Sequence, residues 1–187
     1  MDIFFNNYGY LCENCGKLYE IKYKKFKVLN KEATAIYDYD DSIKELLYKF
    51  KGCHDYELYP VFLYRLKNEL KFLYKDYTLI PMPSYHLHDK ERGFNHVEEM
   101  FKILGLPMMR CLEKIKDIKQ SDLTYEERHT VIFNMRVKND TDITNKKILL
   151  VDDVFTSGST IKAAIKLLSK YHPKIIKVLV MSKTTIN

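Results

Sequence analysis

The chain lacks the features that mark membrane-spanning and secreted proteins. No stretch approaches about 18 uncharged apolar residues, the length that a membrane-spanning helix needs. Residues 1–20 contain no apolar segment after a basic start, so we expect no signal peptide. The sequence also has no internal repeat and no low-complexity tract. These absences predict a cytoplasmic protein without a membrane span.

Cysteine is scarce, with 4 residues among 187. In a cytoplasmic protein so few cysteines indicate thiols or metal ligands rather than disulfides. Cys12 and Cys15 have the C-x-x-C spacing of a zinc knuckle. One knuckle supplies two of the four ligands of a structural zinc site, and Cys53 and Cys111 stand singly in the sequence. Cys12 and Cys15 are therefore a candidate Zn²⁺ pair, with two simple thiols as the alternative.

The composition predicts one well-buried domain with a small appendage, since 46% of the residues are hydrophobic and 30% are charged. We expect an N-terminal module at residues 1–31 and an α/β domain at residues 32–187. The net charge of +6 suits a polyanionic partner. Lysines alternate with aromatic residues in the N-terminal module, which fits either a surface for single-stranded nucleic acid or a solvated hairpin face. These residues are Tyr19, Lys22, Tyr23, Lys24, Lys25, Phe26 and Lys27.

From Ala33 onward, strand-like and helix-like segments alternate. Such alternation predicts a mainly parallel, doubly wound sheet with helices on both faces and a ligand site at the carboxyl ends of the strands. Residues 115–130 are polar and are expected to form a loop. The expected strands cover residues 33–39, 77–80, 108–112, 133–137, 148–152 and 175–181. The expected helices cover residues 43–51, with Gly52 as the residue after the helix end, and residues 58–70, 94–104 and 160–171.

Residues 146–160 have the sequence pattern of a phosphate-binding site. The run Ile148-Leu149-Leu150-Val151 predicts a strand buried on both faces, and Asp152 and Asp153 follow it. A helix that starts at Ser159 or Thr160 has unpaired backbone N–H groups and a dipole that favours an anion. A phosphate group therefore fits at this end of the helix.

The turn between strand and helix supports this interpretation. Gly158 can adopt positive φ and allows a ligand to approach the backbone. The hydroxyl groups nearby can cap the helix or donate to phosphate oxygens. Asp152 and Asp153 leave the strand on opposite faces, and adjacent carboxylates suit ribose hydroxyls or a hydrated Mg²⁺. The hydroxyl side chains are those of Thr156, Ser157, Ser159 and Thr160.

Three other interpretations of this stretch differ in what they require. A P-loop kinase needs a G-x-x-x-x-G-K-[ST] sequence, which the chain does not contain. A receiver domain also places two aspartates after an aliphatic strand, but it needs several more strand and helix units than the residues after Val154 provide. A plain strand–turn–helix connection with a capped helix remains the alternative without function.

The sequence from Val151 to Thr160 closely resembles the phosphoribosyl pyrophosphate (PRPP) signature of type I phosphoribosyltransferases, in which two acidic residues precede a T-[ST]-G-x-T loop. Other patches resemble the ComF-type phosphoribosyltransferase-like proteins of bacterial competence. With the signature they span about residues 33–181. ComF-type proteins usually carry two C-x-x-C knuckles, and only one is present here. The patches are residues 43–52, 80–83, 91–96, 119–124 and 126–128.

The resemblance implies a set of roles in binding PRPP with Mg²⁺. Asp152 and Asp153 would be the catalytic pair that holds the ribose hydroxyls, and Lys51 and Gly52 would bind pyrophosphate. A mobile loop would cover the site, whereas we expect His96 to lie on a helix surface rather than to act as a base. The residues implied for the 5-phosphate are Thr156, Ser157, Gly158, Ser159 and Thr160. The residues implied for the mobile loop are Arg92, Lys119, Gln120 and Arg128.

The same resemblance implies a role in DNA uptake during natural transformation, with single-stranded DNA and other competence proteins as partners. A nucleotide-salvage phosphoribosyltransferase that acts on a free base is the alternative. The motifs specify the donor and leave the acceptor unspecified, and function has to be argued from the site rather than from the fold.

Overall fold

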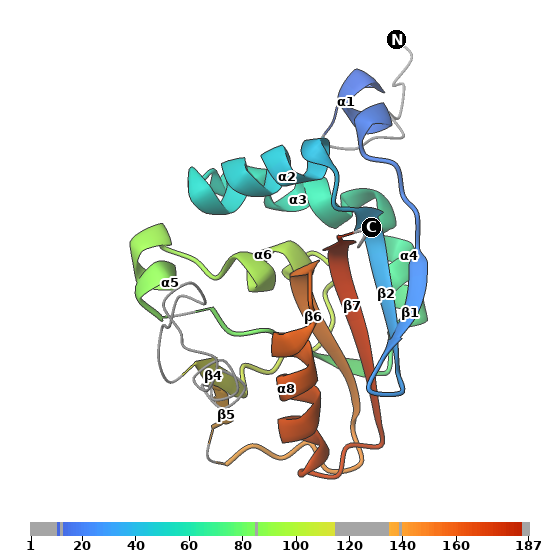
Figure 1. The fold of residues 1–187 in the computed structure, drawn as a ribbon, viewed down its shortest axis with the longest axis vertical. Helices are drawn as coiled ribbons and strands as arrows, with labels where there is room; N and C mark the ends of the chain where they lie inside the picture. Colours follow the sequence, from blue (N-terminus) through green and yellow to red (C-terminus); the bar gives the residue numbers. More distant parts are fainter. Residues whose placement is uncertain (1–10, 12, 85, 115–134, 139, 185–187) are drawn as a thin grey trace.

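The computed structural model describes residue 11 and residues 13–84, 86–114, 135–138 and 140–184, with a five-stranded sheet at the centre (Figure 1). The strand order is β1-β2-β7-β6-β3. The pairs β2–β7, β7–β6 and β6–β3 are parallel, whereas β1 is antiparallel to β2. The predicted mainly parallel α/β fold is therefore confirmed. The strands of this sheet are β1 (Lys24–Val28), β2 (Lys31–Asp38), β3 (Tyr77–Pro81), β6 (Lys147–Phe155) and β7 (Ile175–Lys183).

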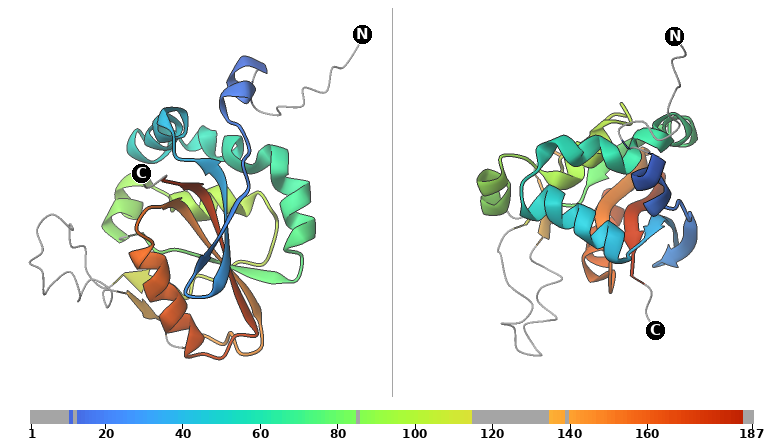
Figure 2. Two further views of the ribbon diagram at one scale, coloured as in Figure 1. Left: turned by 45° about the vertical axis from the view of Figure 1, so that its right-hand side comes forward. Right: turned by 90° about the horizontal axis from the view of Figure 1, so that it is seen from above.

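Helical segments cover both faces of the sheet (Figures 1 and 2). One face packs against α2, α3, α4 and α6, and the other packs against α8. None of the helices in the described part of the chain is long and apolar enough to cross a membrane. The helices are α1 (Glu13–Leu18), α2 (Asp41–Leu47), α3 (Tyr59–Leu63), α4 (Lys67–Leu73), α5 (His86–Arg92), α6 (His96–Lys102) and α8 (Ser159–Ser169). Short helical turns are η1 (Tyr48–Gly52), η2 (Tyr56–Leu58) and η3 (Tyr64–Leu66).

Strand β6 is buried on both of its faces, as its aliphatic run predicts. Leu149 and Val151 pack into the core beneath α2, α3, α4 and α6, whereas Ile148 and Leu150 pack into the core beneath α8. Side chains alternate along a strand with period two. The alternation fixes which way each polar residue that follows in β6 will point.

A small antiparallel sheet lies on the side of the central sheet that α8 covers. It pairs β4 (Leu112–Lys114) with β5 (Met135–Val137), and its Leu112 and Met135 are buried in the core that α8 covers. The expected strand at residues 133–137 is confirmed within the described residues. The expected strand at residues 108–112 is wrong, because Met108 makes only an isolated bridge to Leu79 and regular pairing starts at Leu112.

The N-terminal boundary predicted between residues 31 and 32 falls inside a hairpin. Strand β1 pairs with β2 from Lys24↔Ala35 to Val28↔Lys31, so residues 24–31 belong to the central sheet. The basic composition of this stretch does not separate it from the α/β domain, because strand pairing joins β1 to β2. The aromatic residues of this stretch also pack inward, since Phe26 contacts Phe155 with ring centroids 4.7 Å apart.

Two helical predictions need correction. The helix expected at residues 58–70 is divided into α3 and α4 by the 3₁₀ turn η3, and Leu63 before this turn has a non-helical φ of -127°. The helix expected at residues 94–104 begins at His96 after an Asn95 cap, and α5 before it was not predicted. The expected helix at residues 160–171 corresponds to α8, which begins at Ser159.

Candidate functional site

The candidate site lies where the parallel strands end. Strand β3 stops at Pro81, opposite Val151, while β6 continues beside β7 as far as Phe155. The structure therefore extends the strand predicted at residues 148–152 by one residue at its amino end and three at its carboxyl end, and the two aspartates lie within it. This edge of a parallel sheet is where ligands bind in open α/β folds.

The loop between β6 and α8 has the backbone that its glycine predicts. Gly158 caps α8 with φ 68° and ψ 10°, a left-handed conformation. An ideal Cβ at this position would lie 2.4 Å from Cζ of Phe155. Only glycine therefore fits without moving the Phe155 ring, which in turn rests on Phe26 of β1.

The hydroxyl groups of this loop face outward. Thr156, Ser157, Ser159 and Thr160 are exposed, and the Oγ atoms of Ser157 and Ser159 are 2.9 Å apart. Gly158 caps α8 without a side-chain hydrogen bond, and Ser157 Oγ accepts the backbone N–H of Ser159 at 3.4 Å. Exposed hydroxyls beside the first turn of an 11-residue helix form a suitable cradle for a phosphate group.

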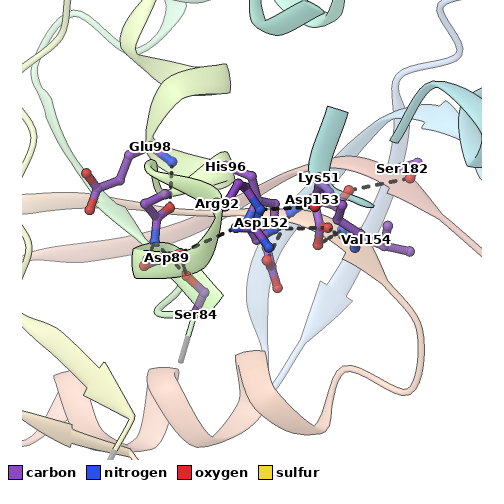
Figure 3. Close-up of polar contacts among 11 residues, drawn as sticks. Lys51, Ser84, Asp89, Arg92, His96, Glu98, Asp152, Asp153, Val154 and Ser182 are labelled. Carbon is purple, nitrogen blue, oxygen red and sulfur yellow. Dashed lines mark hydrogen bonds and ion pairs between the residues drawn. The ribbon is translucent and has the colours of Figure 1, made fainter. Parts of the chain in front are cut away.

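The carboxylate of Asp153 accepts three hydrogen bonds. Its Oδ2 accepts hydrogen bonds from Lys51 Nζ at 2.6 Å and from His96 Nε2 at 3.2 Å (Figure 3). Its Oδ1 accepts from the backbone N–H of Val154 at 2.7 Å. The carboxylate is buried, with 8% of the residue exposed. Burial of a charge is tolerated here because three donors surround it.

The two aspartates have opposite electrostatic environments. Burial opposes ionisation of Asp153, but the hydrogen bond from His96 and the charge of Lys51 hold its pKa well below the usual range. Burial and the nearby charge of Asp153 raise the pKa of Asp152. Asp152 Oδ1 accepts from the backbone N–H of Asp153 at 2.9 Å. Asp153 is therefore the fixed anion of the pair.

Lys51 reaches Asp153 from the segment that follows α2. Asp40 caps α2 by accepting the backbone N–H of Ile43 at 2.9 Å, and the helix then widens into the π-helical turn η1. Gly52 is the last residue of this turn rather than the residue after a helix end, and His54 carries the positive φ of 60°. An ideal Cβ on Gly52 would lie 2.9 Å from the exposed Tyr48 ring, so a side chain at this position would require that ring to shift.

Arg92 lies inside the site, with its side chain only 10% exposed. Its Nε donates to the carbonyl oxygen of Lys51 at 3.1 Å, and its Nη1 lies 3.1 Å from Nδ1 of His96. Asp89 pairs with the same guanidinium at 3.4 Å. Arg92 thus connects the turn that carries Lys51 to the start of α6.

The start of α6 is fixed by a second set of polar contacts. Asn95 accepts the backbone N–H of Glu98 at 3.0 Å and donates to Ser84 at 2.9 Å and to Asp89 at 3.0 Å. Ser84 also donates to Asp89. These bonds hold α5 and α6 in one orientation, and they place His96 at the first position of α6.

The prediction that His96 lies on a helix surface is wrong. The residue is only 9% exposed and faces Asp153. The sequence shows one polar residue at the start of a helix, and nothing in its spacing reveals that α6 packs against β6 at this point. Histidine directly after an Asn cap and an R-G-F sequence was the only local signal.

Several predicted residues lie outside the described residues. They are Lys119, Gln120 and Arg128 of the implied mobile loop, and Cys12 of the implied zinc knuckle. Cys15 lies in α1, and Cys53 and Cys111 are free thiols. Within the described residues no group of three or more His, Cys, Asp or Glu side chains could hold a metal ion. Zinc at Cys12 and Cys15 stays a prediction.

Residues 90–184 match the family profile described as the phosphoribosyl transferase domain. The chain belongs to this family. Among curated relatives it is similar to Competence protein ComFC of Streptococcus pneumoniae, with 34% identity over 143 residues, 76% of this chain and 64% of that protein. Competence protein ComFC of Bacillus subtilis is 26% identical over 173 residues, 86% of this chain and 72% of that protein. The resemblance to ComF-type members of the family is thereby confirmed.

One solved structure shares a lower sequence identity with this chain than the two ComFC proteins do. The purine phosphoribosyltransferase of Pyrococcus horikoshii is 20% identical with a TM-score of 0.42, over 69% of this chain and 77% of that one. The chain spans less than two thirds of the length of the S. pneumoniae relative.

We expect Gly158→Ala to destabilise the protein more than Gly105→Ala. Both glycines have positive φ, at 68° and 60°, and an alanine there costs about 1–2 kcal/mol from backbone strain alone. At Gly105 the nearest atom to an added Cβ is Lys71 Nζ at 3.6 Å, whereas at Gly158 the Phe155 ring must move, at a further cost of about 1–3 kcal/mol. Urea unfolding measures the free energy of unfolding of both variants. Equal losses of stability would contradict a clash between the added Cβ and the Phe155 ring.

Lys51→Met should change how stability depends on pH. The low pKa of Asp153 means that its carboxylate stabilises the fold fully above about pH 4, the range of aspartate in an unfolded chain, and that this stabilisation is lost as pH falls. Without Lys51 the pKa of Asp153 should rise. The free energy of unfolding of the variant should therefore lie below that of the wild type near pH 7, and the gap should narrow below about pH 4.

Lys49→Met provides the matched control for this pH series. Lys49 is an exposed lysine of the same turn and pairs with Glu45, so its loss should leave the free energy of unfolding close to that of the wild type at every pH. If the difference in free energy of unfolding between the wild type and Lys51→Met stays constant between about pH 3 and pH 7, then Lys51 does not stabilise the ionised form of Asp153.

Proposed function

We propose that the chain binds PRPP with Mg²⁺ at the carboxyl edge of its sheet and acts as a ComF-type phosphoribosyltransferase-like protein in DNA uptake. The observation that carries this proposal is the contact between Lys51 and Asp153, 2.6 Å apart. It brings the segment that resembles a pyrophosphate loop against the aspartates of the PRPP signature. Two motifs far apart in the sequence thus meet at one site.

Each part of PRPP has a candidate partner in this arrangement. The exposed hydroxyls and the first turn of α8 suit the 5-phosphate, whose charge the helix N-terminus favours. Asp152 and Asp153 suit the ribose hydroxyls, which donate to carboxylates. Lys51, with 40% of its side chain exposed, suits the pyrophosphate. Displacing pyrophosphate builds positive charge on the ribose ring, and the buried carboxylate of Asp153 would stabilise such charge.

Mg²⁺ fits the donor set at this site. The ion prefers oxygen ligands and is usually held by one or two carboxylates together with substrate phosphates. Asp152 and Asp153 provide the carboxylates, and a cluster of three or more ligands is not required for this mode of binding. When bound with PRPP, Mg²⁺ would neutralise the charge of the leaving pyrophosphate.

Binding of PRPP requires Lys51 to change partners. In the free protein, Lys51 Nζ occupies Asp153 Oδ2, and this oxygen would otherwise accept a ribose hydroxyl. A pyrophosphate group offers the lysine a stronger anion, and the lysine side chain is long and partly exposed. We infer that Lys51 turns from Asp153 to the pyrophosphate as PRPP binds, while the carbonyl oxygen of Lys51 stays bonded to Arg92.

Titration calorimetry of PRPP in the presence of MgCl₂ tests the donor site. The double variant Asp152→Asn, Asp153→Asn should bind at least about 10-fold more weakly than the wild type, because hydrogen bonds to charged groups contribute about 1.5–3 kcal/mol each. Asp140→Asn with Asp142→Asn removes two exposed aspartates away from the site and should bind like the wild type. Equal affinities in all three proteins would remove the assignment of the aspartates.

The role in DNA uptake rests on the similarity to ComFC proteins and on the basic face of β1. Lys25 and Lys27 are exposed, whereas Phe26 between them packs toward the core. The stretch therefore offers cations to a phosphate backbone rather than aromatic rings for base stacking. Residues 24–28 belong to the sheet, so substitution is a cleaner test than deletion of residues 1–31.

Binding of single-stranded DNA should weaken in the variant Lys25→Ala, Lys27→Ala. If each lysine contacts a phosphate, the slope of log affinity against log salt should fall by about 1.4, since each contact contributes about 0.7 on single strands. The control is Lys166→Ala with Lys170→Ala, two exposed positions in the last turn of α8 and at its C-cap. A wild-type protein that binds no DNA would remove this part of the proposal, and transfer of ribose phosphate to a free base would favour nucleotide salvage.

A further inference from the structure

His96 connects two charged residues of the site through its two ring nitrogens. Nδ1 lies 3.1 Å from Nη1 of Arg92, and Nε2 lies 3.2 Å from Oδ2 of Asp153. The ring is buried, and Figure 3 shows it between the two partners. Each polar atom of the side chain therefore has a partner of fixed character.

Those partners determine which ring nitrogen carries the hydrogen. A guanidinium group has only donors, so the contact with Arg92 requires Nδ1 of His96 to accept. A carboxylate whose pKa is held low is an acceptor, so the contact with Asp153 requires Nε2 of His96 to donate. Both contacts are satisfied by one form of the ring, the neutral tautomer with its hydrogen on Nε2.

Arg92 is itself held in place, so it can define this tautomer. Its guanidinium donates to the carbonyl oxygen of Lys51 at 3.1 Å and pairs with Asp89 at 3.4 Å. Asp89 in turn accepts from Asn95, the residue before His96. The guanidinium is fixed from several sides and presents Nη1 to the imidazole.

The second donor to Asp153 Oδ2 is Lys51, and this donor is the one that PRPP would remove. Once Lys51 turns to the pyrophosphate, His96 Nε2 and the backbone N–H of Val154 are the described donors that remain on the carboxylate. A neutral donor at this point keeps the orientation of the carboxylate without cancelling its charge. The negative charge stays available to the ribose.

We propose that His96 is a positioning residue for Asp153, oriented by Arg92 and required while Lys51 is bound to pyrophosphate. The proposal rests on the proposed binding of PRPP, and it assigns the R-G-F-N-H segment to the support of the carboxylate. A glutamine at position 96 could serve in the same way, since its amide oxygen can accept from Arg92 and its amide nitrogen can donate to Asp153. A leucine could do neither.

The affinity for PRPP with Mg²⁺ should depend on whether the side chain at position 96 can hydrogen-bond both Arg92 and Asp153. We expect His96→Gln to bind PRPP within about 3-fold of the wild type and His96→Leu to bind at least about 10-fold more weakly, the loss expected for one hydrogen bond to a charged group. In the presence of Asp153→Asn, His96→Leu should cause little further loss, because its target carboxylate is gone. Lys102→Ala, an exposed position of α6, is the matched control and should bind like the wild type.

A second measurement needs no PRPP. The ¹⁵N shifts of the imidazole should show the Nε2–H tautomer in the wild-type protein, and Asp153→Asn should change the Nε2 signal. A wild type that binds no PRPP but shows this tautomer would overturn the proposed function and leave the contact of His96 with Asp153 intact. An Nδ1–H tautomer would overturn the positioning role, as would equal PRPP affinities of folded His96→Leu and wild type.

Discussion

The buried carboxylate of Asp153 is the constraint on which the rest of the site depends. A charge taken out of water needs donors that replace its hydration, and here they come from the side chains of Lys51 and His96 and from the backbone of Val154. The two side chains belong to different helical segments. The segment after α2 and the start of α6 must therefore both be held close to β6 for the carboxylate to remain ionised.

The scaffold gives the two partners of Asp153 different freedom. The aspartate stands on a strand that pairs with β7 as far as Phe155 and whose faces are both buried. His96 is fixed by Arg92 and by the Asn95 cap. Lys51 contacts Asp153 only through the end of a long, partly exposed side chain. A fixed anion with one fixed neutral donor and one movable cation is an arrangement that can exchange an internal ion pair for an anionic ligand.

Local pattern was enough to predict the strand, the glycine turn and the helix of residues 147–169, because each depends on neighbours in sequence. Four aliphatic residues in a row indicate a strand that is buried on both faces. Glycine at position 158 allows the positive φ of the turn and leaves room for the Phe155 ring. The packing of His96 on Asp153 depends on how α6 crosses β6, which no spacing within residues 91–104 encodes. The same limit explains the missed boundary at residue 31, because strand pairing overrides composition.

Arg92 illustrates how the structure changes the meaning of a motif. The sequence resemblance assigned it to a loop that covers the site, yet its guanidinium is buried and bonded to the backbone of Lys51, to His96 and to Asp89. For Arg92 to move with a cover, these bonds would have to break, and a buried cation would lose its partners. In the proposed site, the simpler role is that of a brace, since one residue then fixes the turn that carries Lys51 and the ring that orients Asp153.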